Sequence, residues 1–116
     1  MRRVVVTGLG LVSPLGNTVS ESWSALLAGK SGIAPITSFD ATPFNCRIAA
    51  QVKGFDAAKV LGTKDGRRFE PFTAYGVSAA MEALDDAGLT FCDDDLSCNR
   101  AGTVIGSGIG GIATKC

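Results

Sequence analysis

Three glycines near the end of the chain have the spacing that a phosphate-binding loop uses. Gly106, Gly108 and Gly111 satisfy the pattern G-x-G-x-x-G, and an apolar run that predicts a strand comes directly before them. A loop of this kind offers backbone N–H groups to the phosphates of a dinucleotide at the start of a helix. An acidic residue about 20 positions further on would bind the ribose. The sequence stops too soon after Gly111 to supply this residue or the helix, which weighs against dinucleotide binding.

The first glycine-rich segment, "TGLGLVSPLG", fits the dinucleotide pattern less well. Gly8 and Gly10 are present, but Ser13 stands where the third glycine belongs, and Pro14 removes an amide donor. A simpler interpretation of both segments is that glycine permits tight backbone turns.

Groups that could do acid–base or nucleophilic chemistry are scarce. The chain has no histidine, which removes the commonest general base and the Ser-His and Cys-His pairs. The three aspartates of "CDDDLSCNR" have no further ligands at defined offsets, so a solvated loop is favoured over a metal site there. No C-x-x-C spacing joins the four cysteines, which favours thiols in a reducing compartment over a zinc site. They are Cys46, Cys92, Cys98 and Cys116. We therefore expect no catalytic residue, no metal site and no cofactor within these residues.

Composition and charge exclude several classes of protein. The chain has 116 residues, of which 46% are hydrophobic and 19% charged, so a folded domain is expected rather than disorder. Its 11 basic and 11 acidic side chains balance, which gives no overall field to attract nucleic acid. Charges and glycines interrupt every apolar run before it reaches membrane-spanning length. The start "MRRVVVTG" leaves no room for a targeting segment, and either a cytoplasmic protein or a product of trimming is expected.

The elements around these groups begin with a strand. Residues 4–6 are consecutive valines, which predict a strand buried on both faces. A helix then begins at a capping box, in which Thr18 accepts from the amide of Glu21 and the Glu21 carboxylate reaches back. Gly29 follows its apolar stripe and ends it.

The middle of the chain is predicted to be less regular. Pro35 and Pro43 favour a loop over residues 31–44, and "CRIAAQV", residues 46–52, predicts a strand. A short helix is possible over residues 56–61, and "TKDGRR" predicts a solvated turn.

The longest predicted helix runs from about Arg68 to Ala87. Its apolar residues recur at spacings of three and four, Pro71 belongs in its first turn, and Gly88 stops it. Its alanine-rich face implies close approach to a sheet or another helix. Residues 101–108, "AGTVIGSG", predict a last strand that enters the glycine loop. This alternation predicts an α/β fold with a mainly parallel sheet, and we expect the chain to be the opening piece of a larger domain.

Three blocks together resemble the N-terminus of β-ketoacyl-acyl-carrier-protein synthases, the elongating (type II) condensing enzymes of fatty acid synthesis. They are "RRVVVTGLGLVSPLGNTVSESWSALLAGKSGI", "RRFEPFTAYGVSAAMEALDDAGL" and "RAGTVIGSGIGG". Phe69-Glu70 stands where the family more often has Met-Asp, and residues 37–60 match loosely. The resemblance implies a layered αβαβα thiolase fold, usually dimeric, of which residues 1–116 would be a partial N-terminal domain. It also implies a decarboxylative Claisen condensation that uses a nucleophilic cysteine and two histidines. None of the four cysteines here matches that nucleophile, and the chain has no histidine.

The same resemblance suggests two sites. Gly108 and Ile109 match a loop beside the acyl pocket, where the residue matching Ile109 swings to admit a chain; the alternative is ordinary core packing. Lys64, Arg67 and Arg68 match positions that present basic charge to an acidic acyl carrier protein, loaded with acyl or malonyl groups. The alternative there is a solvated helix start. For the whole chain, the alternative function is a nucleotide-binding or non-catalytic α/β interaction module.

Overall fold

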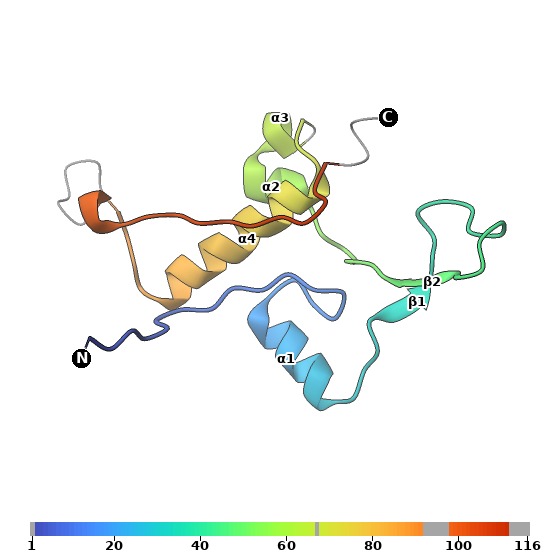
Figure 1. Ribbon diagram of the computed structural model, residues 1–116, viewed down its shortest axis with the longest axis horizontal. Helices are drawn as coiled ribbons and strands as arrows, with labels where there is room; N and C mark the ends of the chain where they lie inside the picture. Colours follow the sequence, from blue (N-terminus) through green and yellow to red (C-terminus); the bar gives the residue numbers. More distant parts are fainter. Residues whose placement is uncertain (1, 67, 92–97, 112–116) are drawn as a thin grey trace. The chain divides into compact units, whose positions relative to one another are not determined.

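The computed structural model, drawn in Figure 1, describes residues 2–66, 68–91 and 98–111. The chain divides into two compact units. One unit is Leu11–Phe55. The other combines Met1–Gly10 with Asp56–Cys116. Each unit is described by itself below.

Helix α1 (Val19–Leu27) in the first unit confirms the predicted N-terminal helix. Thr18 Oγ1 accepts a hydrogen bond from the backbone N–H of Glu21 at 3.2 Å, as the capping box predicts. Glu21 Oε2 accepts from the backbone N–H of Asn17 at 2.8 Å, one residue earlier than expected. Gly29 has a φ of 65°, the left-handed conformation that ends a helix.

A two-stranded antiparallel sheet follows in the same unit. Strand β1 (Ile33–Pro35) pairs with β2 (Ile48–Ala50), so that Pro35 lies opposite Ile48. The strand predicted over residues 46–52 is confirmed in its central part. The prediction of a loop around Pro35 is wrong, because Pro35 belongs to β1. Alternate amides of an edge strand point away from its partner, so proline is tolerated at such positions.

The second unit begins its helical part with two short helices. Asp56 caps α2 (Ala57–Leu61) by accepting from the backbone N–H of Ala58 at 3.0 Å, which confirms this short helix. The segment "TKDGRR" was predicted to be a solvated turn, but α3 (Thr63–Gly66) is helical. Gly66 packs so closely on Ala58 that a Cβ at residue 66 would lie 2.8 Å from the Ala58 Cα. This contact with α2, which the local sequence does not reveal, favours the helical turn.

Helix α4 (Pro71–Asp86) is the long predicted helix, somewhat shorter at both ends. Pro71 lies in its first turn and Gly88 follows it with a φ of 64°, both as predicted. The short 3₁₀ helix η1 (Cys98–Arg100) precedes the last described segment.

The alanine-rich face of α4 receives the N-terminal segment of the chain. A Cβ on Gly8 would overlap the backbone of Ala83, and one on Gly10 would overlap the backbone of Ala79. The backbone N–H of Leu9, between them, donates to Asp86 Oδ2 at 2.9 Å. The close approach predicted for this face is therefore confirmed, but the predicted partner, a sheet or another helix, is wrong, because a loop segment packs there.

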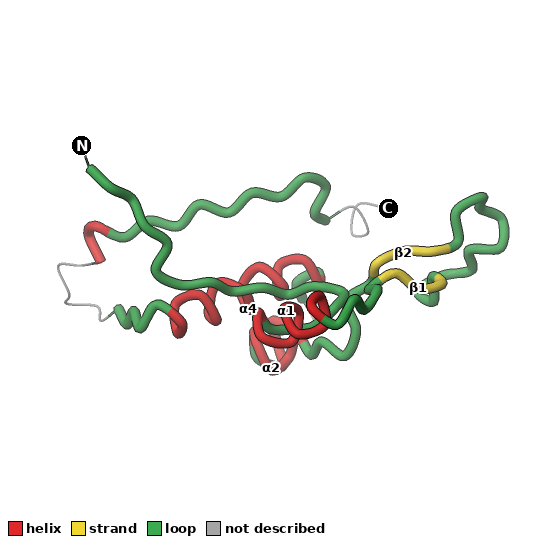
Figure 2. The backbone as a smooth tube through the Cα atoms, turned by 90° about the horizontal axis from the view of Figure 1, so that it is seen from below, coloured by secondary structure: helices red, strands yellow, loops and turns green. Residues whose placement is uncertain are grey.

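Two predicted strands are absent from the part of the chain that the structure describes. Residues 4–6 and 101–108 run as loops in Figure 2, and the mainly parallel sheet that they were to build is not formed. β-branched residues favour an extended backbone, but a strand also needs a neighbour to complete its hydrogen-bonded ladder. Among the described residues, no neighbour of this kind lies beside either segment.

We expect the 116-residue chain to self-associate. Val4 is 97% exposed and Val104 is 100% exposed, whereas the buried residues in the described part of the chain are small, namely Ser22, Ala25, Ala41 and Ala74. Exposed apolar side chains, together with backbone N–H and C=O groups that no neighbouring strand pairs, favour association between chains. Sedimentation should show species larger than a monomer that increase with concentration. A monomer that melts cooperatively at micromolar concentration would contradict this expectation.

Candidate functional site

The glycine loop presents one large apolar side chain to solvent. Ile109 is 77% exposed and lies between two pairs of small residues. The backbone N–H of Gly110 donates to Ser107 Oγ at 3.1 Å, which closes the turn. Gly111 has a φ of 85°, a conformation that residues with a side chain rarely adopt. The loop can therefore project a branched apolar group, and the place beside an acyl pocket that the resemblance suggests for Gly108 and Ile109 stays a prediction.

The loop lies against the beginning of α4. A Cβ on Gly110 would come within 2.6 Å of the Phe72 ring, so the loop backbone rests directly on that ring. Beside this contact is a mainly apolar hollow of about 310 Å³, lined by residues 105–107 and by the first two turns of α4. Sequence reasoning missed Phe72, because its spacing in the helix marked it only as part of an apolar stripe.

Phosphate binding fits this loop poorly. A phosphate cradle presents consecutive N–H groups at the start of a helix. Through Gly111, the last residue described here, the loop forms turns, and the Gly110 N–H is already bonded to Ser107. What the loop offers a ligand is the apolar side chain of Ile109.

The structure describes two of the three residues Lys64, Arg67 and Arg68, which are called the basic turn below. Lys64 lies on α3 and Arg68 just before α4, and both are exposed. The Arg68 guanidinium carbon lies 5.8 Å from the centroid of the Phe69 ring, in a cation–π arrangement. Arg67 lies outside the described residues. Lys64 and Arg68, which both belong to the second unit, are thus accessible to an anionic partner molecule.

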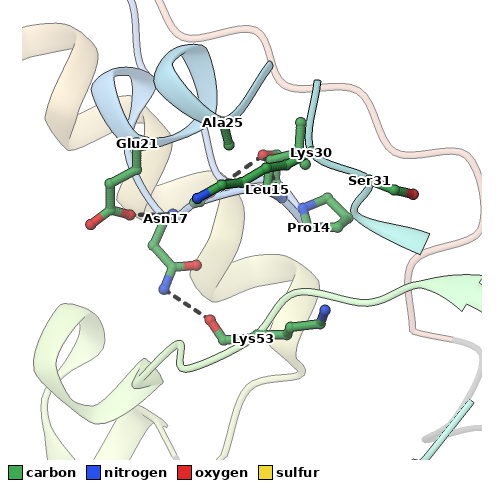
Figure 3. A pocket seen from close by; sticks show the side chains of 10 residues that line it. Pro14, Leu15, Asn17, Glu21, Ala25, Lys30, Ser31 and Lys53 are labelled. Atoms are coloured by element: carbon green, nitrogen blue, oxygen red, sulfur yellow. Dashed lines mark hydrogen bonds between the residues drawn. The ribbon is translucent and has the colours of Figure 1, made fainter. Parts of the chain in front are cut away.

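A polar hollow of about 290 Å³ in the first unit was not predicted, because its lining comes from separate stretches of sequence. Figure 3 shows Lys30 and Lys53 beside it, with their ammonium ends pointing in different directions. Asn17 Nδ2 donates to the backbone carbonyl of Lys53 at 3.0 Å, and Asn17 Oδ1 is buried without a hydrogen-bond partner. Since the two ammonium groups do not converge, this arrangement provides no built anion site.

The cysteines and acidic side chains that the structure describes form no metal-binding cluster. Cys46 is exposed and its thiol donates to the Ile48 carbonyl at 3.5 Å, while Cys98 is partly buried. Cys92 and Cys116 lie outside the described residues. In the ranges that the structure describes, no three His, Cys, Asp or Glu side chains gather as metal ligands would. No described helix combines the length and apolarity needed to cross a membrane.

Comparisons with known proteins identify the class and then the family. A solved structure titled "The ishigamide ketosynthase/chain length factor" superposes with a TM-score of 0.66 at 40% sequence identity, over 77% of this chain and 22% of that one. The chain therefore has an α/β fold of the ketosynthase class. The sequence model described as "Beta-ketoacyl synthase, N-terminal domain" matches residues 1–115. The chain belongs to this family.

Curated relatives agree with this assignment. A 3-oxoacyl-[acyl-carrier-protein] synthase 2 of Vibrio harveyi is 51% identical over 111 residues, and the protein of the same name from Coxiella burnetii is 52% identical over 111 residues. Each match covers 96% of this chain and 26% of the relative. The chain thus spans about a quarter of the length of these relatives.

Proposed function

We propose that this chain is the N-terminal part of a β-ketoacyl-acyl-carrier-protein synthase of fatty acid synthesis. The enzyme would condense an acyl group, carried on a cysteine thioester, with malonyl-carrier protein. Loss of CO₂ from the malonyl group leaves a carbanion that attacks the acyl carbonyl, and the cysteine thiolate departs. The observation that carries this proposal is the family match over residues 1–115.

The chain would contribute the acyl-chain side of the site rather than its reacting groups. Ile109 and Gly108 would border the acyl chain, which agrees with an apolar, 77% exposed side chain on a glycine turn. With no histidine and no cysteine that matches the family's nucleophile, these residues would leave bond making to other parts of the enzyme.

Carrier protein would dock on the basic turn formed by Lys64, Arg67 and Arg68. The accessibility of Lys64 and Arg68 supports this role, and so does the carrier protein in the printed name of the Vibrio harveyi relative. Two exposed cations at the rim of a site can attract an acidic partner even though the chain is neutral overall.

The complete enzyme would be a cytoplasmic homodimer with a layered αβαβα architecture. In it, residues 4–6 and 101–108 would find the strand neighbours they lack here and join a mainly parallel sheet. Their exposed valines support this role, since strands of such sheets are apolar on both faces.

A chimera tests the proposed function. In the full-length chimera, the 111 residues of this chain that match the Vibrio harveyi synthase replace the matching segment of that protein. We expect the full-length chimera to form 3-ketoacyl product from acyl- and malonyl-carrier protein, and the 116-residue chain alone to form none. A folded full-length chimera without activity would contradict the proposed function, and so would product made by the chain alone.

A further inference from the structure

The four glycines of the loop differ in what their surroundings require. A Cβ at Gly106 or Gly108 would meet no atom within 4 Å, and neither residue has a positive φ. A Cβ at Gly110 would collide with the Phe72 ring and with Ser107 Oγ, and Gly111 needs its positive φ. The first two glycines are therefore unconstrained in this conformation, whereas the last two are held.

This difference divides the loop into a free half and an anchored half, with Ile109 at the boundary. Glycine loses more backbone freedom on ordering than any other residue, so unconstrained glycines are suited to a backbone that changes conformation. The anchored half is held by the Phe72 ring, while the hydrogen bond from the Gly110 N–H to Ser107 Oγ links the two halves and would break when the free half moves.

The hollow beside the loop gives the free half a place to move. It is about 310 Å³ in volume and mainly apolar, and Gly106 and Ser107 line one side of it. An apolar cavity of about 150 Å³ already accommodates a benzene molecule. The hollow can therefore take up one branched aliphatic side chain without displacing α4.

We infer that Phe72 is a positioning residue for the glycine loop, because its ring anchors Gly110. When an acyl chain enters, residues 106–108 turn about this anchor and carry Ile109 toward the hollow. This inference rests on the proposed function for the role of Ile109. Phe72 would thereby influence which chain lengths are accepted, without touching the reacting atoms.

Hydrogen exchange tests the anchor independently of activity. In the full-length chimera, Phe72→Ala should speed exchange of the peptide that covers residues 105–111 by about tenfold, because the loop loses its support. Phe72→Leu should preserve most of the protection and guards against a folding defect. Met81→Ala, at an exposed position of the same helix, is the matched control and should leave this peptide unchanged. Equal exchange in the Phe72→Ala and unsubstituted proteins would overturn the inference.

Acyl-chain selectivity tests the consequence of the anchor. Gly110→Ala should push the loop off the ring and reduce kcat/KM for long acyl chains about tenfold more than for short ones. Adding Phe72→Ala should restore much of this loss, because the added methyl group then has room. Equal losses for all chain lengths, or losses that simply add in the double variant, would overturn the inference. An inactive but folded full-length chimera would contradict the proposed function instead, while the exchange experiment still decides whether Phe72 is the anchor.

Discussion

Replacing Gly10 by alanine is expected to lower the free energy of unfolding by about 3 kcal/mol, at the upper end for overpacking. The new methyl group would overlap the carbonyl of Ala79 and approach the Ala83 nitrogen at 2.8 Å. Both obstacles are helix backbone, so α4 or the N-terminal segment must shift as a whole. The shift would also strain the hydrogen bond from the Leu9 N–H to Asp86.

Gly76→Ala is the matched control for this prediction. Gly76 lies inside α4, and a Cβ there would meet no atom within 4 Å. The same substitution should therefore stabilise the protein, by about 0.5–1 kcal/mol, through helix propensity and reduced freedom of the unfolded chain. Urea unfolding of the full-length chimera measures both variants. Similar changes of stability in the two would show that contact with α4 is not what requires glycine at position 10.

Reversing the charge of Arg67 and Arg68 together should weaken the use of carrier-protein substrates by on the order of 10- to 100-fold in kcat/KM. Substrates on short pantetheine thioesters should be nearly unaffected, because they would reach the proposed acyl pocket without contacting the proposed docking surface. The loss should shrink as salt is raised, since exposed charges act through screened attraction. Steady-state kinetics of the full-length chimera with both substrate types measures the effect.

Arg2 and Arg3 provide the matched control for this charge reversal. They are also adjacent and exposed, and they lie outside the basic turn. Reversing both changes the net charge by the same amount and should leave carrier-protein kinetics near those of the unsubstituted protein. Equal losses in the two double variants would indicate an effect of net charge alone. Equal losses on carrier-protein and pantetheine substrates would indicate a defect in folding or in the active site.

Local sequence was enough to predict α1, α2 and α4, but not α3. Thr18, Pro71 and Gly88 act on hydrogen bonds within a few residues of themselves, so their effect is the same in any tertiary setting. The acyl-pocket role of Gly108 and Ile109 came from the resemblance and stays a prediction. The resemblance carried by the three sequence blocks supplied the family, which no spacing rule alone would have given.

Contacts between distant residues decided the rest. The strands predicted at residues 4–6 and 101–108 failed because a ladder depends on a neighbour, whose presence the strand's own residues do not specify. Strand β1 was not predicted for the same reason, because Pro35 favours a loop and only the pairing of β1 with β2 shows that this segment is a strand. The contact between Phe72 and Gly110 joins residues 38 positions apart. Periodicity places Phe72 on the apolar face of α4. Only the tertiary structure shows that this ring contacts the backbone at Gly110.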